Sequence, residues 1–256
     1  LHSKGGVDPF YDRSLKVEVW YPAIIPEGKK ELVTYEATLG LFKDSARPLI
    51  PYTFLGRALR NAAPDLSAGK FPLIIVSHGY PGSRLLLTYL TENLASKGYV
   101  VVAIAHTEST YSDRAAFQST LLNRSKDDLF VLNQIAALSI VDSKSFLAGL
   151  ADANNTALIG YSMGGYSCKL DTVFSQMTGG SNALKVRTTN NAAYKASIDT
   201  RIKAVVAFAP WGMQRGVWDA SGLQGLKVPT FFVAGNLDDV SGYEDGIKAI
   251  YTGAVN

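Results

Sequence analysis

The stretch TALIGYSMGG, residues 156–165, decides the fold. It reads as a short apolar strand, then a Gly-x-Ser-x-Gly turn, then the beginning of a helix. A serine in such a tight turn points its hydroxyl group outward, and only small neighbours leave room for it. Gly160 and Gly164 leave that room, so Ser162 is the candidate nucleophile and is expected to have a positive φ or another strained backbone conformation.

The rest of the chain alternates apolar strands with helical patterns. Strands are predicted at 15–21, 71–77, 99–105, 202–208 and 230–234, and helices at 83–97, within 127–150 and at 243–251. Residues 23–70 read as a loop-rich excursion with a short helix over 53–61, and residues 178–191 as a loop. This alternation predicts one α/β domain over residues 1–256, built on a doubly wound, mostly parallel sheet flanked by helices.

Composition and charge narrow the function classes. The 256 residues are 47% hydrophobic and 18% charged, with a net charge of +3 and no long basic run, which disfavours nucleic acid as a partner. The charges are interpreted as solvated surface. Cys168 is the single cysteine, so it forms no internal disulfide and reads as a small buried side chain. No apolar run is long enough for an integral membrane segment. Oligomeric state and compartment, cytoplasmic or exported, stay open.

Polar residues follow four of the predicted strands. They are SHGYPG at 77–82, HTES at 106–109, the serine turn itself, and AGNLDD at 234–239. In an open parallel sheet, ligands bind beyond the carboxyl ends of the strands. We therefore expect these segments to converge at one edge of the sheet.

The chain resembles the α/β-hydrolase esterases around the dienelactone hydrolases, the platelet-activating-factor acetylhydrolases and the bacterial cutinase-like polyester hydrolases. The resemblance runs from about residue 15 to the C-terminus in the family's order. It implies the α/β-hydrolase fold and a serine carboxylic-ester hydrolase that forms an acyl-enzyme with a small or lipid-like ester. The motifs that carry it are VEVWYPA (17–23), SHGY (77–80), LASKGYVV (94–101), GYSMGG (160–165), APW (209–211), VPT (228–230) and AGNLD (234–238).

The resemblance assigns the polar catalytic residues. Ser162 matches the nucleophile, and Asp238 matches the acid that orients a catalytic histidine. Asp239 is the immediate alternative to Asp238, and both aspartates could instead cap a turn.

The resemblance also assigns the residues that would surround the substrate. The backbone N–H groups of Tyr80 and Met163 match an oxyanion hole. Trp211 and the Tyr80 side chain match aromatic walls of the substrate site, although Trp211 also reads as ordinary core. His78 matches a residue that shapes the oxyanion loop. No metal or cofactor is implied.

A catalytic base is missing from the expected place. The order in this fold is serine, acid, histidine, but His2, His78 and His106 all precede Ser162. Only 18 residues (256 − 238) follow Asp238. We therefore expect a C-terminally truncated hydrolase domain that lacks its last strand and exposes an unpaired edge beside 230–234. The alternatives are a catalytically silent hydrolase-fold binding protein, or recruitment of His106 as the base.

Overall fold

The computed structural model describes residues 12–41, 44, 46–114, 117–167, 199–216, 223, 226 and 228–254. The predictions for Cys168 and for a loop over 178–191 fall outside these residues.

The centre of the molecule is a six-stranded sheet with the strand order β1-β7-β6-β8-β9-β10. Only β1 runs antiparallel to its neighbour, and the other five strands are parallel. The carboxyl ends of those five strands therefore share one edge, as predicted. The strands are β1 (Lys16–Trp20), β6 (Phe71–Ser77), β7 (Val100–Ala105), β8 (Ala151–Tyr161), β9 (Ile202–Phe208) and β10 (Thr230–Val233).

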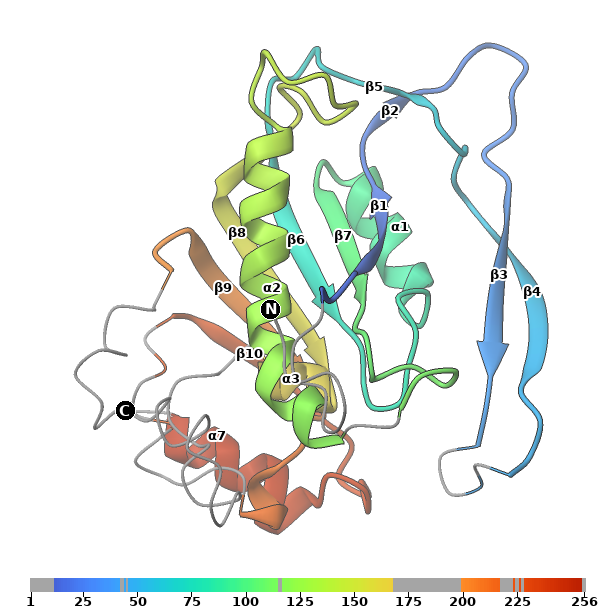
Figure 1. Cartoon of the computed structure of the whole chain (residues 1–256). Helices are drawn as coiled ribbons and strands as arrows, with labels where there is room; N and C mark the ends of the chain where they lie inside the picture. The colour runs from blue at the N-terminus through green and yellow to red at the C-terminus, as the bar shows by residue number, and fades with distance from the viewer. Residues whose placement is uncertain are drawn as a thin grey trace.

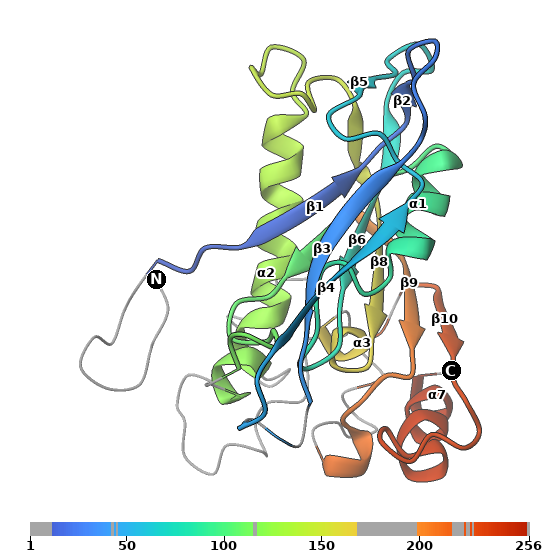
Figure 2. The ribbon, with the colours of Figure 1, turned by 90° about the vertical axis from the view of Figure 1, so that its right-hand side faces the viewer.

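Helices cover both faces of this sheet. Helix α2 (Phe117–Leu138) lies on one face and α1 (Thr88–Ser96) on the other, as the two views show (Figures 1 and 2). The central strands are consequently buried on both faces, with Leu73 and Val101 at 0% exposure. That explains why β6 and β7 are continuous apolar runs.

Smaller elements extend from this centre. They are β2 (Ala23–Ile24), β5 (Ala63–Pro64), β3 (Val33–Leu39), β4 (Ile50–Gly56), α3 (Met163–Ser167), the 3₁₀-helix η2 (Met213–Arg215), the π-helix η3 (Tyr243–Lys248) and α7 (Ala249–Ala254). β2 pairs with β5, and β3 pairs with β4 as a hairpin beside the sheet (Figure 1). Among the described helices, none is both long and apolar enough to cross a membrane.

The predicted helix over 53–61 is wrong, because most of this segment belongs to strand β4 and the turn after it. Tyr35 pairs with Phe54 across the hairpin, and their rings lie 5.2 Å apart. Both rings pack into the core beneath α1. Pairing with a distant strand decides this structure, and a local pattern of residues cannot reveal it.

Strand β1 and helix α2 also differ from their predictions. In β1, Val17 and Val19 alternate with polar residues, a pattern that favours a face buried through the two valines. Glu18 and Trp20 are instead the buried residues, and Val17 is exposed. β1 lies between two core clusters, so apolar alternation does not mark its buried face. α2 begins ahead of the predicted stretch because its first turns bury polar side chains, which interrupt the apolar period.

The edge of the sheet beside β10 is unpaired among the described residues, as predicted. β10 pairs with β9 alone. Phe231 is 66% exposed and Val233 is 38% exposed, so apolar side chains accompany the open backbone edge. Such an edge can accept a further strand.

Candidate active site

Ser162 occupies a sharp turn between β8 and α3. Its φ is +53°, so the predicted positive φ is confirmed. The Ser162 N–H donates to the carbonyl of Phe208 at 2.9 Å, and the N–H of Trp211 donates to the Ser162 carbonyl at 3.2 Å. The end of β9 and the turn after it thus hold both polar backbone groups of Ser162, and this fixed backbone maintains a conformation that non-glycine residues rarely adopt.

The two motif glycines bring three backbone segments into contact. A Cβ on Gly160 would lie 2.2 Å from the Gly164 carbonyl oxygen. A Cβ on Gly164 would lie 2.0 Å from the Ser77 carbonyl oxygen, at the end of β6. Neither distance is compatible with a side chain, so the glycines allow the beginning of α3 to pack directly on the ends of β8 and β6.

The segment after β6 lies directly against the candidate nucleophile. A Cβ on Gly79 would lie 3.3 Å from the Ser162 Cβ, so Tyr80 follows a residue that touches Ser162. Met163 is the first residue of α3, and a first-turn N–H has no acceptor within its own helix. The structure therefore places Met163 directly after Ser162, and Tyr80 one residue after a contact of Ser162.

An aromatic row lies beside the serine. Tyr80 and Phe117 are edge to face with ring centroids 5.0 Å apart, and Phe117 and Trp211 are edge to face at 6.1 Å. The sequence interpretation named Tyr80 and Trp211 but missed Phe117, which joins them. Nothing local marks Phe117, because it meets its two partners only through the fold.

The loop after β10 fixes the orientation of Asp238. Its Oδ1 accepts the N–H groups of Val240 at 2.9 Å and Ser241 at 2.8 Å, while its Oδ2 bonds to no residue that the structure describes. The Ser241 hydroxyl donates to the carbonyl of Ala209 at 3.0 Å, which ties this loop to the turn before Trp211. The Asp239 side chain is exposed. One oxygen of Asp238 thus fixes the carboxylate, and the other is left for a further donor.

Both histidines that the structure describes are buried, and His78 itself begins the loop of residues 78–80. His106 contacts the Ser77 Oγ through Nε2 and the Asp127 Oδ2 through Nδ1, each at 2.8 Å. His78 contacts the Gly79 carbonyl through Nδ1 at 2.6 Å, and its Nε2 accepts the His106 N–H at 3.2 Å. All four ring nitrogens have partners other than Ser162, so the alternative of His106 as the base for Ser162 does not fit this structure.

Four charged side chains share this interior, which corrects the expectation that charges are solvated surface. Arg124, Asp127 and Asp128 are buried, and the Arg13 side chain is only 1% exposed. Arg13 forms an ion pair with Asp127. Buried charges persist where ion pairs and hydrogen bonds replace water.

Burial holds the pKa of both histidines well below the ordinary value. For His78 the largest cause is desolvation, followed by the charge of Arg124 and by His106. For His106 it is again desolvation, followed by Arg124 and Arg13. Both rings are therefore neutral at neutral pH.

These shifts predict a pH-dependent stability. In the unfolded chain both histidines bind a proton below the ordinary histidine pKa of about 6.5, whereas in the folded chain they stay neutral there. Stability is therefore full above that pH and falls as the pH decreases, with a limiting slope of about 2–3 kcal/mol per pH unit for the two groups. Urea titrations between pH 7 and pH 5.5 measure the slope. His106→Asn keeps a donor toward Asp127 without titrating, so its slope should be about half; an unchanged slope would contradict the assignment.

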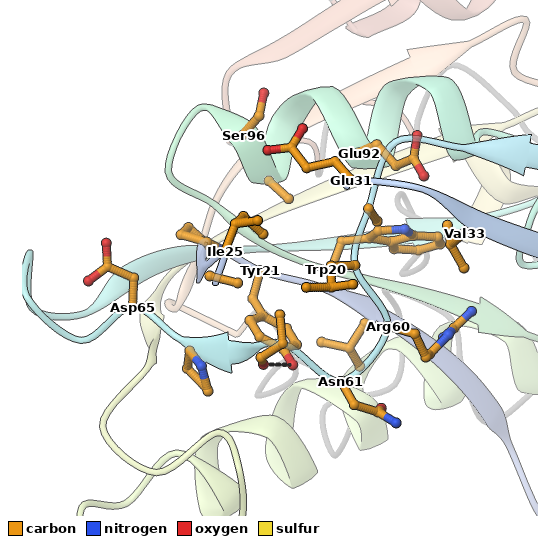
Figure 3. Close-up of a pocket in the computed structure, with 18 of the residues that line it drawn as sticks. Trp20, Tyr21, Ile25, Glu31, Val33, Arg60, Asn61, Asp65, Glu92 and Ser96 are labelled. Carbon is orange, nitrogen blue, oxygen red and sulfur yellow. Dashed lines mark hydrogen bonds between the residues drawn. The ribbon is translucent and has the colours of Figure 1, made fainter. Parts of the chain in front are cut away.

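A separate pocket lies around β1, away from the carboxyl ends of the parallel strands (Figure 3). Its volume is about 1060 Å³, and it is lined by β1, the β2–β5 pair and the end of α1. None of the predicted site residues lines it. Several of its polar groups bond within the fold: the Trp20 Nε1–H donates to the Tyr35 hydroxyl at 2.7 Å, and that hydroxyl donates to Glu92 at 2.8 Å. Among the described residues no group of His, Cys, Asp and Glu is arranged to hold a metal ion.

The fold and the serine turn define the class. A mostly parallel sheet carries a strained serine between a central strand and the next helix, with helices on both faces. That arrangement is the α/β-hydrolase fold, with Ser162 in a strand–turn–helix motif.

The comparisons with known proteins narrow the class. The family described as PET hydrolase-like (PETase) matches residues 34–255, and the chain belongs to that family. Cutinase est1 of Thermobifida alba is 26% identical over 168 residues, which are 66% of this chain and 43% of that protein. Cutinase 2 of Thermobifida cellulosilytica is 25% identical over 168 residues, 66% of this chain and 48% of that protein. The matches thus span less than half of each of these two relatives.

Proposed function

We propose that this protein is a serine hydrolase that cleaves carboxylic esters through an acyl-enzyme. The observation that carries the proposal is Ser162 itself, which sits at a φ of +53° with the loop of Gly79 against its Cβ. Strained backbone at a strand end is typical of a nucleophile, because the turn exposes the hydroxyl toward the substrate.

The proposed reaction has two halves. The Ser162 Oγ attacks the ester carbonyl carbon while a general base takes its proton, and the carbonyl oxygen becomes negative. The N–H groups of Tyr80 and Met163 donate to that oxygen. The alcohol leaves with the proton and the acyl group stays on Ser162. Water, deprotonated by the same base, then attacks the acyl carbon, so that the carboxylic acid product leaves and the Ser162 hydroxyl is restored.

The proposal also needs a carboxylate that orients the general base, and the general base itself. Asp238 orients the base through the oxygen that its own loop does not use. Because His78 and His106 are bonded to other partners, the base is taken to be a histidine outside the described residues.

The substrate is proposed to be an ester with an apolar or aromatic acyl group. The row of Tyr80, Phe117 and Trp211 offers flat apolar contacts beside the nucleophile. The PET hydrolase-like family and the cutinase relatives support polyesters as one form of that substrate.

Hydrolysis and labelling of the natural full-length protein test the function together. p-Nitrophenyl esters of graded acyl length should be turned over, and a fluorophosphonate should modify Ser162, as located by peptide mass spectrometry. A polyester film then tests the polymeric substrate. Absence of both turnover and labelling would favour a catalytically silent binding protein on the same fold.

A further inference from the structure

Arg124 is fully buried and bonds to the loop of residues 78–80 beside Ser162. It lies two turns into α2, whose first turns are next to α3 (Figure 1). Its guanidinium donates to the carbonyl oxygen of His78 and, at 2.9 Å, to that of Gly79. It also donates to the Ser109 hydroxyl. Burying an arginine is expensive, so these bonds must compensate for the lost hydration.

The Gly79 carbonyl receives a second donor. His78 Nε2 accepts the His106 N–H, so in the neutral ring the proton is on Nδ1, which donates to Gly79 at 2.6 Å. The Gly79 carbonyl thus accepts two hydrogen bonds, from Arg124 and from His78. Two donors on its two lone pairs fix the direction of this carbonyl.

The direction of that carbonyl sets the direction of the Tyr80 N–H. The two groups belong to one peptide unit, which is planar and trans, so they point in opposite directions. We propose that Arg124 is a positioning residue that turns the Tyr80 N–H toward the ester oxygen at Ser162. This inference rests on the proposed function, since it concerns the oxyanion donors of that reaction.

A chain of hydrogen bonds holds Arg124 in place. Asp127 is a carboxylate and accepts from His106 Nδ1, so His106 Nε2 carries no proton and accepts from the Ser77 hydroxyl. The Ser77 oxygen in turn faces the Arg124 guanidinium at 3.4 Å. Asp127 is anchored by its ion pair with Arg13. The buried histidine and aspartate therefore support the arginine, and neither histidine that the structure describes is left to act as the base for Ser162.

The positive charge adds to the effect of orientation. A charged donor polarises the peptide unit that it bonds to, and the N–H at the other end of that unit becomes a stronger donor. Arg124 bonds to two successive units, His78–Gly79 and Gly79–Tyr80. The developing negative charge on the substrate oxygen would meet a peptide already polarised toward it.

Kinetics separate this role from plain stabilisation of the fold. Arg124→Met removes the charge and the donors. Arg201→Met is the matched control, because it removes an arginine that is paired with Asp199 just before β9 and is not part of the chain that holds Arg124. At a temperature well below both Tm values, kcat should fall about 10- to 100-fold in Arg124→Met, with KM within about threefold. Arg201→Met should keep the kcat of the wild type. Arg124→Lys keeps the charge without the planar fork and should lie in between.

A second readout is independent of activity. With ¹⁵N-labelled tyrosine, the Tyr80 amide resonance should shift in Arg124→Met and stay in place in Arg201→Met. If Arg124→Met is not recovered folded, kcat and the Tyr80 amide resonance of Arg124→Lys test the inference in its place. A kcat that falls equally in the arginine variants, or a Tyr80 amide that does not move, would overturn the inference. If the wild type shows no turnover that depends on Ser162 while the amide does shift, it is the proposed function that fails.

Discussion

Replacing Ser162 by alanine is expected to abolish ester hydrolysis and to leave the fold intact. The hydroxyl is the group that attacks, and loss of such a nucleophile lowers kcat by about 10⁴- to 10⁶-fold in comparable hydrolases. Alanine keeps the Cβ that touches the Gly79 loop, and both backbone hydrogen bonds of Ser162 remain possible. Initial rates with p-nitrophenyl butyrate, together with the thermal unfolding curve, measure the two effects.

A serine far from the site provides the control for that replacement. Ser143 is half-buried beyond the C-terminal end of α2, where its hydroxyl donates to the Leu138 carbonyl at 2.6 Å. Ser143→Ala should keep full activity. Residual hydrolysis in Ser162→Ala within tenfold of the wild type would point to a different nucleophile.

The strand–turn–helix motif around Ser162 was predictable because its constraints are local. Gly160 and Gly164 are needed within the turn that they form, and the apolar residues before them can only be a buried strand. The same holds for β6 and β7, whose apolar runs show burial on both faces. The hairpin of β3 and β4 was not predictable in this way, since Tyr35 and Phe54 stabilise each other only after the chain has turned back on itself.

The sequence names candidate reactive groups and not the residues that support them. The Gly-x-Ser-x-Gly motif names Ser162, the family resemblance names Tyr80 and Asp238, and the roles of all three stay predictions. Arg124 reads in the sequence as one more exposed charge on a polar helix, and only the fold brings it to the carbonyls of His78 and Gly79. Partners of a buried charge lie in distant segments, so no spacing rule reveals them.

The candidate site thus depends on two sets of contacts, one between backbone segments and one between buried polar side chains. Backbone contacts between the ends of β6 and β8 set the distance from the Gly79 loop to Ser162. The buried polar side chains of α2 set the orientation of that loop. Changes in the first set should disturb the fold, whereas changes at Arg124 should act mainly on the rate.

Asp238→Asn is the replacement that tests the acid and is expected to lower kcat by about 10⁴-fold. The amide oxygen of asparagine can still accept the N–H groups of Val240 and Ser241, so the loop should keep its shape. Its NH₂ group cannot accept a hydrogen bond from the ring N–H of the catalytic histidine and would favour the wrong tautomer of that histidine. The kcat for p-nitrophenyl butyrate and the thermal unfolding midpoint are the measurements.

Asp239→Asn is the matched control, because it makes the same chemical change one residue further along the same loop. The Asp239 side chain is exposed, so its replacement should leave kcat within about twofold. If Asp239→Asn instead loses activity and Asp238→Asn keeps it, the assignment of the acid is wrong by one residue. If neither loses activity, the carboxylate that orients the base lies elsewhere, and the two hydrogen bonds to Asp238 serve only to cap the turn. The pair of variants therefore distinguishes a catalytic acid from a structural one within a single loop.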